Sequence, residues 1–263
     1  MELVDVVITT YNETTRLFRA VDSVKSQTTR VNKIWIVDDG SGDSVVEEVI
    51  SAYKLDNQVE LVLLGHSGTP GVSRKSGVLK SSADWIAFLD ADDYWHPEKI
   101  EKQLDESHKS SAHLIFTNAF KVQRGHLEPY FPRENFRKKL KFRHMIKENK
   151  LVNSSVLVKR SYLDLVNSYA DLVNVRAVED YATWLRLSSI IEFVGLPEEL
   201  TYYSVSDTSL SRESKIDKRL FALVDFLIWS ANHKSTDVFV GFRKFISRIM
   251  ASYRICRETL STK

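Results

Sequence analysis

The feature that most constrains the fold is an alternation of short apolar runs with segments of helical period in the first half of the chain. The runs are rich in β-branched and aromatic residues, as is typical of buried strands, and they cover Val4–Ile8, Ile34–Val37, Val59–Leu64, Trp85–Leu89 and Leu114–Phe116. Between them, apolar residues recur at helical spacing, as at Leu17, Val21 and Val24. This alternation predicts an α/β fold with a mostly parallel central sheet flanked by helices.

The second half of the chain is less regular. The stretch 123–150 loses the alternation, and we expect a loop and a short helix there; it carries a cluster of basic residues, Arg137, Lys138, Lys139, Lys141, Arg143 and Lys147. A strand-like run returns at Val156–Lys159, a helix containing Trp184 follows, and the chain beyond Ser214 has a helical pattern. We expect one domain over residues 1–212, with halves 1–118 and 119–212, and a helical C-terminal extension over 213–263.

Composition narrows the class of protein. The chain has 263 residues, of which 43% are hydrophobic and 27% charged, as in folded soluble proteins. The net charge of +2 neither demands nor excludes an anionic partner, and we expect no nucleic-acid partner. Cys256 is the sole cysteine, so neither an intramolecular disulfide nor a cysteine metal site can form.

The sequence also predicts the cellular location of the protein. The N-terminus lacks the basic start and long apolar region of a signal peptide. The most apolar stretch, Leu220–Ala231, is interrupted by Asp225 and is too short to span a bilayer. We therefore expect a cytoplasmic protein, acting at the inner face of the membrane.

Polar residues follow three of the predicted strands at the point where each strand ends. In an open α/β sheet, ligands bind outside the carboxyl ends of the strands. The first strand is followed by Thr9–Glu13, the second by Asp38–Asp43 and the fourth by Asp90–Asp93. Acidic groups gathered there repel one another, and a divalent metal ion with a bound diphosphate would compensate their charge.

Each of these runs also has a simpler interpretation. Asp38–Ser41 taken alone is typical of a solvated turn that caps the next helix. Asp90-Ala91-Asp92 is a three-residue pattern that arises often by chance. The three endings together, each directly after an apolar strand, favour a functional site.

The order of these motifs resembles family 2 glycosyltransferases of the GT-A fold. The matching runs are Ile8–Asn12, Val37–Asp43 and Phe88–Asp93, and the order of motifs continues over residues 2–212. The resemblance implies a nucleotide-sugar-binding half over 1–118 and an acceptor-binding half over 119–212. It also implies inverting transfer from a nucleoside diphosphate sugar, assisted by a divalent metal, Mn²⁺ or Mg²⁺.

The resemblance implies roles for individual residues near the donor. Asp92 would be the metal ligand, and the donor would be bound by Thr9, Tyr11, Glu13, Asp39, Arg74, Asp90 and Ala91. Among these, Tyr11 would stack on the nucleobase, and Asp39 would hydrogen-bond to it. Outside this context, Tyr11 would be interpreted as an edge-of-core aromatic residue and Arg74 as a surface helix residue.

A second acidic motif lies in the other half. Glu179-Asp180 precedes the Trp184 helix, and the resemblance implies that Asp180 is the catalytic base that deprotonates the acceptor hydroxyl. An inverting displacement needs one base opposite the departing diphosphate, and a carboxylate at a helix start is well placed for it. The alternative is that both residues only stabilise the helix N-terminus through its dipole.

The sequence also departs from the family pattern. Ser204 and Ser206 stand where the family often has an arginine and a histidine, so a metal ligand found in some members is missing here. Thr9, Thr69 and Lys75 replace a proline, a glycine and an asparagine. These changes leave the nucleotide open, and we expect a UDP-sugar.

The resemblance implies a transferase that adds a sugar to a hydroxyl of a glycan or lipid-linked glycan, with bacterial surface polysaccharide biosynthesis as its setting. One alternative is a non-catalytic nucleotide-sugar-binding subunit, which would need no base. A sugar nucleotidyltransferase would open with a glycine-rich loop, and residues 1–15 contain no glycine. The basic cluster and an amphipathic helix over Phe242–Tyr253 would provide peripheral contact with an anionic membrane. The alternative for this helix is packing against the catalytic domain.

Overall fold

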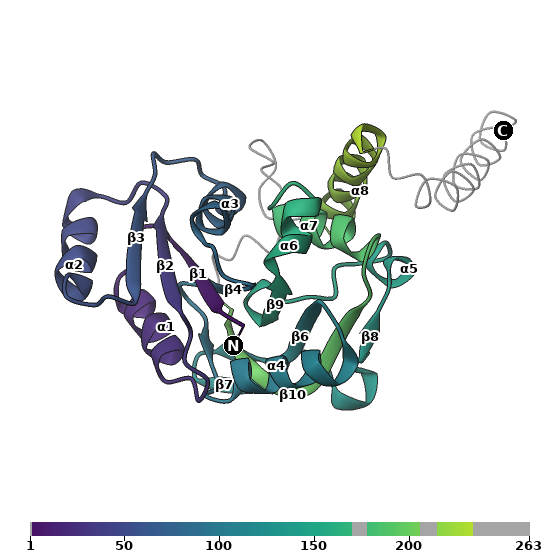
Figure 1. Cartoon of the computed structure of the whole chain (residues 1–263), viewed down its shortest axis with the longest axis horizontal. Coiled ribbons are helices and arrows are strands. Elements are labelled where there is room, and N and C mark those ends of the chain that lie inside the picture. Colours follow the sequence, from purple (N-terminus) through teal and green to yellow (C-terminus); the bar gives the residue numbers. More distant parts are fainter. Residues whose placement is uncertain (1, 170–177, 206–214, 234–263) are drawn as a thin grey trace, which may run out of the picture.

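The computed structural model describes residues 2–169, 178–205 and 215–233, with side chains from residue 218 onward in the last segment (Figure 1). One ten-stranded sheet organises this part of the chain, in the order β3-β2-β1-β4-β9-β6-β10-β5, with β7 paired to β6 and β8 to β10. The six longest strands are β1 (Val4–Thr10), β2 (Lys33–Asp38), β3 (Val59–Leu63), β4 (Trp85–Asp90), β6 (Leu114–Gln123) and β10 (Phe193–Ser204).

The sheet is mixed and mostly parallel, as predicted. The six longest strands run in one direction. The four shortest run in the other: β5 (Tyr94–Trp95), β7 (His126–Pro129), β8 (Lys139–Leu140) and β9 (Val156–Lys159). Because β9 lies between β4 and β6, a strand of the second half joins the two parts of the sheet.

Helices cover both faces of the sheet (Figure 1). They are α1 (Thr15–Lys25), α2 (Asp43–Tyr53), α3 (Pro70–Lys80), α4 (Lys99–Ser110), α5 (Phe142–Met145), α6 (Arg160–Leu165), α7 (Glu179–Ser188) and α8 (Lys215–Asn232). Side chains alternate between faces along a strand: Val6 and Ile8 of β1 pack in the core formed with α1, α2 and α4, whereas Val7 packs in the core formed with α3, α7 and α8. Short 3₁₀ helices lie at Arg133–Asn135 and Asn153–Ser155.

Helix α3 approaches the sheet closely because it has a glycine at the contact. A Cβ atom at Gly77 would lie 2.5 Å from Cγ1 of Val7 and 3.2 Å from Cγ2 of Val37. The helix carries Arg74 one turn earlier, so this contact sets how far Arg74 reaches over the strand ends.

The five apolar runs and Val156–Lys159 form strands, which confirms those predictions. The prediction for 123–150 was incomplete, because the segment contains β7 and β8 besides the short helix α5. Strand β10 was not predicted; it contains Pro197, and its pairing with β6 has register shifts between Leu196 and Thr201. The predicted helix Phe242–Tyr253 lies outside the described residues.

Helix α8 confirms the helical pattern expected beyond Ser214, as far as the described residues extend. It packs against α7 through Ala222, Phe226 and Trp229, which are buried in the core. None of the helices in the described part of the chain is both long and apolar enough to cross a membrane.

Candidate active site

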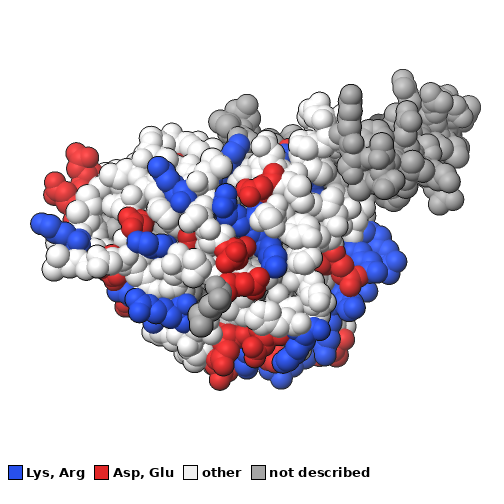
Figure 2. All heavy atoms as spheres, viewed as in Figure 1, with Lys and Arg blue, Asp and Glu red and all other residues white. Residues whose placement is uncertain are grey.

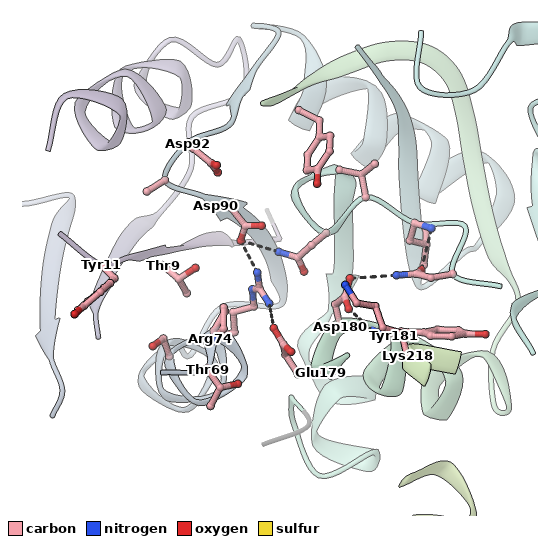
Figure 3. A pocket seen from close by; sticks show the side chains of 18 of the residues that line it. Thr9, Tyr11, Thr69, Arg74, Asp90, Asp92, Glu179, Asp180, Tyr181 and Lys218 are labelled. Carbon is pink, nitrogen blue, oxygen red and sulfur yellow. Dashed lines mark hydrogen bonds and ion pairs between the residues drawn. The ribbon is translucent and has the colours of Figure 1, made fainter. Parts of the chain in front are cut away.

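A cleft of about 1210 Å³ lies at the carboxyl ends of β1, β2 and β4 (Figure 3). All nine residues assigned to the site from the sequence line it, namely Thr9, Tyr11, Glu13, Asp39, Arg74, Asp90, Ala91, Asp92 and Asp180. The parallel strands bring seven of them together at one edge of the sheet, and helix α3 brings Arg74 to the same edge. The first turn of α7 brings Asp180 to the same cleft.

One end of the cleft combines an aromatic ring with a buried carboxylate. The Tyr11 ring stacks on His66, with centroids 4.4 Å apart. The carboxylate of Asp39 accepts hydrogen bonds from the Ser67 N–H at 3.0 Å and the Gly68 N–H at 2.9 Å. The loop after β3 thus orients Asp39 beside an exposed aromatic ring, an arrangement that suits a nucleobase.

The adjacent Asp38 makes its hydrogen bonds within the turn that follows β2. The Asp38 carboxylate accepts hydrogen bonds from the Gly40 N–H at 3.0 Å and the Ser41 N–H at 2.7 Å. Gly40 has a φ of +80°, and a Cβ there would lie 2.6 Å from the backbone nitrogen of His66. Asp38 therefore stabilises the turn after β2, but it does not cap the next helix, because the N-cap of α2 is Gly42 and has no side-chain hydrogen bond. Asp39 is left to face the cleft.

Arg74 bridges the two halves of the site from a buried position. Its Nη2 lies 2.6 Å from Oδ1 of Asp90, and its Nη1 lies 3.2 Å from Oε1 of Glu179 (Figure 3). Asp90 also accepts a hydrogen bond from the Asn153 amide at 3.2 Å. The guanidinium offsets the repulsion between these carboxylates and joins the end of β4 to the start of α7.

The acidic loop after β4 contains one anchoring and one accessible carboxylate. Asp93 is fully buried and accepts hydrogen bonds from the Ser154 hydroxyl at 2.5 Å and the Ser204 N–H at 2.8 Å. Asp92 lines the cleft, where burial and the neighbouring Asp90 raise its pKa to about 6. A nearby cation would hold such a carboxyl group in its ionised form.

The acidic residues of the cleft fit a metal ion that shares its coordination with a substrate. Among the described residues, no three or more His, Cys, Asp or Glu side chains are grouped as metal ligands. Mg²⁺ is commonly held by one or two carboxylates together with substrate phosphates and water. Asp92 supplies a carboxylate of that kind, whereas Asp90 is already engaged by Arg74.

Asp180 has the environment expected of a base. Its Oδ2 accepts a hydrogen bond from the Asn149 amide at 3.1 Å, and its Oδ1 accepts one from the Tyr181 N–H at 2.6 Å. Burial, together with the negative charge of Glu179, raises the pKa of Asp180 to about 6. The group is thus ionised at neutral pH and more basic than an ordinary aspartate.

Several residues of the cleft were not assigned from the sequence. They include His66, Tyr130, Asn149, Asn153, Glu179 and Lys218. Glu179 had a visible signal, because it adjoins Asp180. His66 also had a signal, because it lies in the loop after the predicted strand β3. The others come from a loop, from a 3₁₀ helix, from the β7 region and from α8, where no strand-end motif precedes them.

The two serines that depart from the family pattern are Ser204 and Ser206. Ser204 ends β10 and ties it to the acidic loop, because its hydroxyl donates a hydrogen bond to the backbone oxygen of Asp92. The backbone oxygen of Asp92 also accepts a hydrogen bond from Nη2 of Arg19 at 2.6 Å. Ser206 lies outside the described residues.

Sequence relatives are glycosyltransferases. A protein of Bacillus subtilis (strain 168) named "Putative teichuronic acid biosynthesis glycosyltransferase TuaG" is 27% identical over 214 residues, which cover 80% of this chain and 81% of TuaG. WfaP of Escherichia coli, a UDP-Glc:α-D-GlcNAc-diphosphoundecaprenol β-1,3-glucosyltransferase, is 28% identical over 215 residues, 80% of each protein.

Solved structures share the fold. Residues 1–349 of S. aureus TarS in complex with UDP-GlcNAc match with a TM-score of 0.68 at 14% identity, over 85% of this chain and 66% of that one. The UDP complex of the same protein matches with a TM-score of 0.64 at 16% identity, over 90% of this chain and 74% of that one. The architecture is therefore of the GT-A type.

The family model described as "Glycosyl transferase family 2" matches residues 5–164. That match includes the strand-end motifs, Arg74 and the acidic loop after β4. The chain belongs to family 2 of the glycosyltransferases.

Proposed function

We propose that this protein is an inverting, metal-dependent glycosyltransferase that moves a sugar from a UDP-sugar to a hydroxyl of a glycan or lipid-linked glycan acceptor. The setting we propose is bacterial surface polysaccharide biosynthesis. The observation that carries the proposal is a single cleft with acidic residues on two sides. Asp92 lies on the β4 side and Asp180 on the α7 side, with Arg74 between them (Figure 3).

This arrangement suits a displacement at an anomeric carbon. Asp180 would take the proton of the acceptor hydroxyl while its oxygen attacks the sugar from the side opposite the diphosphate. Tyr11 and Asp39 would hold the nucleobase, with the ribose and diphosphate along Thr9 and the Asp90 loop. Mn²⁺ or Mg²⁺ at Asp92 would neutralise the charge that develops on the departing diphosphate. Asn149 would keep the Asp180 carboxylate oriented.

Support for the donor and acceptor classes comes from the relatives. The printed name of WfaP gives a UDP-glucose donor and a lipid diphosphate acceptor, and TarS was solved with UDP and with UDP-GlcNAc. Both TuaG and WfaP align over about four-fifths of this chain. We extend the nucleotide and the acceptor class to this chain.

The proposal is tested by donor screening followed by a metal titration. We expect slow hydrolysis of one UDP-sugar without acceptor, and UDP binding by calorimetry that weakens with chelator or with Asp92→Asn. Equal UDP affinity with Mn²⁺ and with chelator would remove the metal from the mechanism. UDP-sugar binding without hydrolysis or transfer under any condition would favour the non-catalytic binding subunit instead.

A further inference from the structure

Helix α8 exposes an apolar face to solvent. Between Leu220 and Ala231 it has one charged residue, Asp225. The exposed side chains are Leu220 (57%), Phe221 (47%), Val224 (44%), Leu227 (37%) and Ile228 (60%), which we call the α8 stripe. A surface helix normally presents polar residues to water, so this contiguous stripe indicates a contact with another apolar phase or surface.

The opposite face of α8 is already fixed in the core. Asp225 makes a buried, two-point ion pair with Arg186 of α7, at 2.7 Å between Oδ1 and Nη2 and 3.0 Å between Oδ2 and Nε. Phe226 and Trp229 are buried on the same side. The rotation of the helix is therefore set by its inner contacts, and these contacts hold the α8 stripe outward.

Basic residues lie beside the α8 stripe. The Phe142 ring of α5 is 4.9 Å from the Phe226 ring, and Nε of Arg219 donates a hydrogen bond to the Ile146 oxygen at 3.1 Å. These contacts place α5 next to α8. Helix α5 and the segments just before and after it carry the exposed side chains of Arg137, Lys138, Arg143 and Lys147. Figure 2 shows positive charge gathered around the α5 region, below α8 in this view.

The sequence that follows α8 has the same charge. Residues 234–263 contain seven Lys or Arg and two Asp or Glu. An apolar stripe bordered by cationic residues is typical of a helix that lies in the interface of an anionic bilayer. A second copy of the chain would bring like charges together, so the charge pattern favours lipid over self-association.

We propose that the α8 stripe docks the protein on the surface of an anionic phospholipid bilayer, with the side chains of Phe221 and Ile228 inserted among the lipids. The cationic residues 137–147 would then contact the lipid headgroups. The helix lies on the bilayer and does not cross it, in keeping with its length and its buried ion pair.

This docking would place the cleft at the membrane surface. Leu220 belongs both to the α8 stripe and to the wall of the cleft. Lys218, Arg219 and Leu223 of α8 line the same wall. A lipid-linked acceptor could reach Asp180 while its lipid stays in the bilayer. This consequence rests on the proposed function, whereas the docking itself does not.

The test is sedimentation of the full chain with vesicles of phosphatidylcholine, alone or mixed with phosphatidylglycerol. We expect salt-sensitive binding to the mixed vesicles. The double substitution Phe221→Gln and Ile228→Gln should lower the partition coefficient by about tenfold or more, because two apolar side chains lose their burial in lipid. Replacing Arg137 and Lys138 with alanine should lower it by about fivefold per residue, on the anionic vesicles alone.

The matched control is Ile50→Gln with Leu55→Gln. Ile50, 45% exposed, lies in α2, and Leu55, 93% exposed, lies just after its end. We expect this control to bind vesicles as the wild type does. UDP affinity without vesicles should be the same in all variants, so loss of docking and failure of the proposed donor chemistry are distinguishable. If the α8 double variant is unfolded by circular dichroism, the single substitution Ile228→Gln repeats the test with a milder change.

Three results would overturn the proposal. The first is wild-type protein that does not sediment with mixed vesicles, and the second is an α8 variant that sediments as the wild type does. The third is an α8 variant that converts a dimer to a monomer by light scattering, or loses thermal stability while it keeps vesicle binding. A dimer would make the stripe a contact between copies, and lost stability would make it part of the fold.

Discussion

Asp180 is the residue to which the proposed mechanism assigns the proton transfer, and its surroundings raise its pKa to about 6. We expect Asp180→Asn to keep UDP affinity and to lower kcat by roughly 10²- to 10⁴-fold, about 3 to 5 kcal/mol of barrier, because asparagine preserves size and removes basicity. Turnover is measured with a competent acceptor, and UDP affinity by calorimetry.

The alternative for Asp180 is a helix-start carboxylate without a chemical role. Asparagine is nearly as good as aspartate near a helix N-terminus, so kcat of the asparagine variant would then stay close to that of the wild type. A fall in kcat together with lost UDP binding would place Asp180 in the donor site.

The pH dependence of turnover follows from the raised pKa of the same group. With the Asp180 pKa at about 6, kcat should be constant above about pH 7 and fall about tenfold per pH unit below the pKa, because only the ionised carboxylate accepts a proton. Saturating metal and donor are needed, since the Asp92 pKa is also raised to about 6. A kcat that stays constant down to pH 4.5 would exclude Asp180 as the base.

The same shift changes stability in a defined direction. The folded chain holds the Asp180 proton more tightly than the unfolded chain, where the ordinary pKa is 3.8. The contribution of this group to the free energy of unfolding is therefore fully present below the unfolded-state pKa and is lost as the pH rises through about 6. Ionised Asp180 thus costs stability at the pH where the proposed mechanism requires it as a base.

At the scale of elements, the placement of α3 on the sheet depends on Gly77. We expect Gly77→Ala to lower the free energy of unfolding by about 1 to 3 kcal/mol and to raise the donor KM, because the added Cβ would overlap Val7 and shift the helix that carries Arg74. Urea denaturation and donor kinetics measure the two effects.

The control for this substitution is Gly65→Ala, where a Cβ meets nothing within 4 Å. An alanine at position 77 would also gain helix propensity, by about 1 kcal/mol relative to glycine. If Gly77→Ala proves as stable as the wild type, the sheet has room for a Cβ, and the proposed close approach of α3 does not position Arg74.

The elements themselves were predictable to different degrees. Strands β1, β2 and β4 are buried on both faces, so they appear in the sequence as continuous apolar runs. Strand β10 has a proline, two glutamates and register shifts. Strand β7 is short and exposed, and strand β8 has only two residues. Their pairing comes from neighbouring strands and leaves no periodic pattern in their own residues.

At the scale of the whole molecule, the sheet is continuous across the two halves. Strand β6 spans residue 118, and β9 lies between β4 and β6. We therefore expect one cooperative urea transition over residues 2–205, seen at the same midpoint by tryptophan fluorescence and by far-ultraviolet circular dichroism. Two separate transitions would show that the halves fold independently despite the shared sheet.

The sequence by itself determined the α/β architecture and the donor side of the cleft. Parallel strands end at the same edge of a sheet, so motifs that directly follow β1, β2 and β4 must meet there, and Tyr11, Asp39 and Asp92 all line one cleft. A local pattern was sufficient here, because each apolar run predicts a buried strand. The residues directly after the run then lie at the carboxyl end of that strand.

Only the tertiary structure decided which groups face each other across the cleft. Arg74 pairs with Glu179, 105 positions away, and α8 adds Lys218 to a wall that the strand ends do not form. Such contacts depend on how helices pack over the sheet, which is set by shape and burial summed over many distant residues. No local spacing of residues in the sequence predicts this packing.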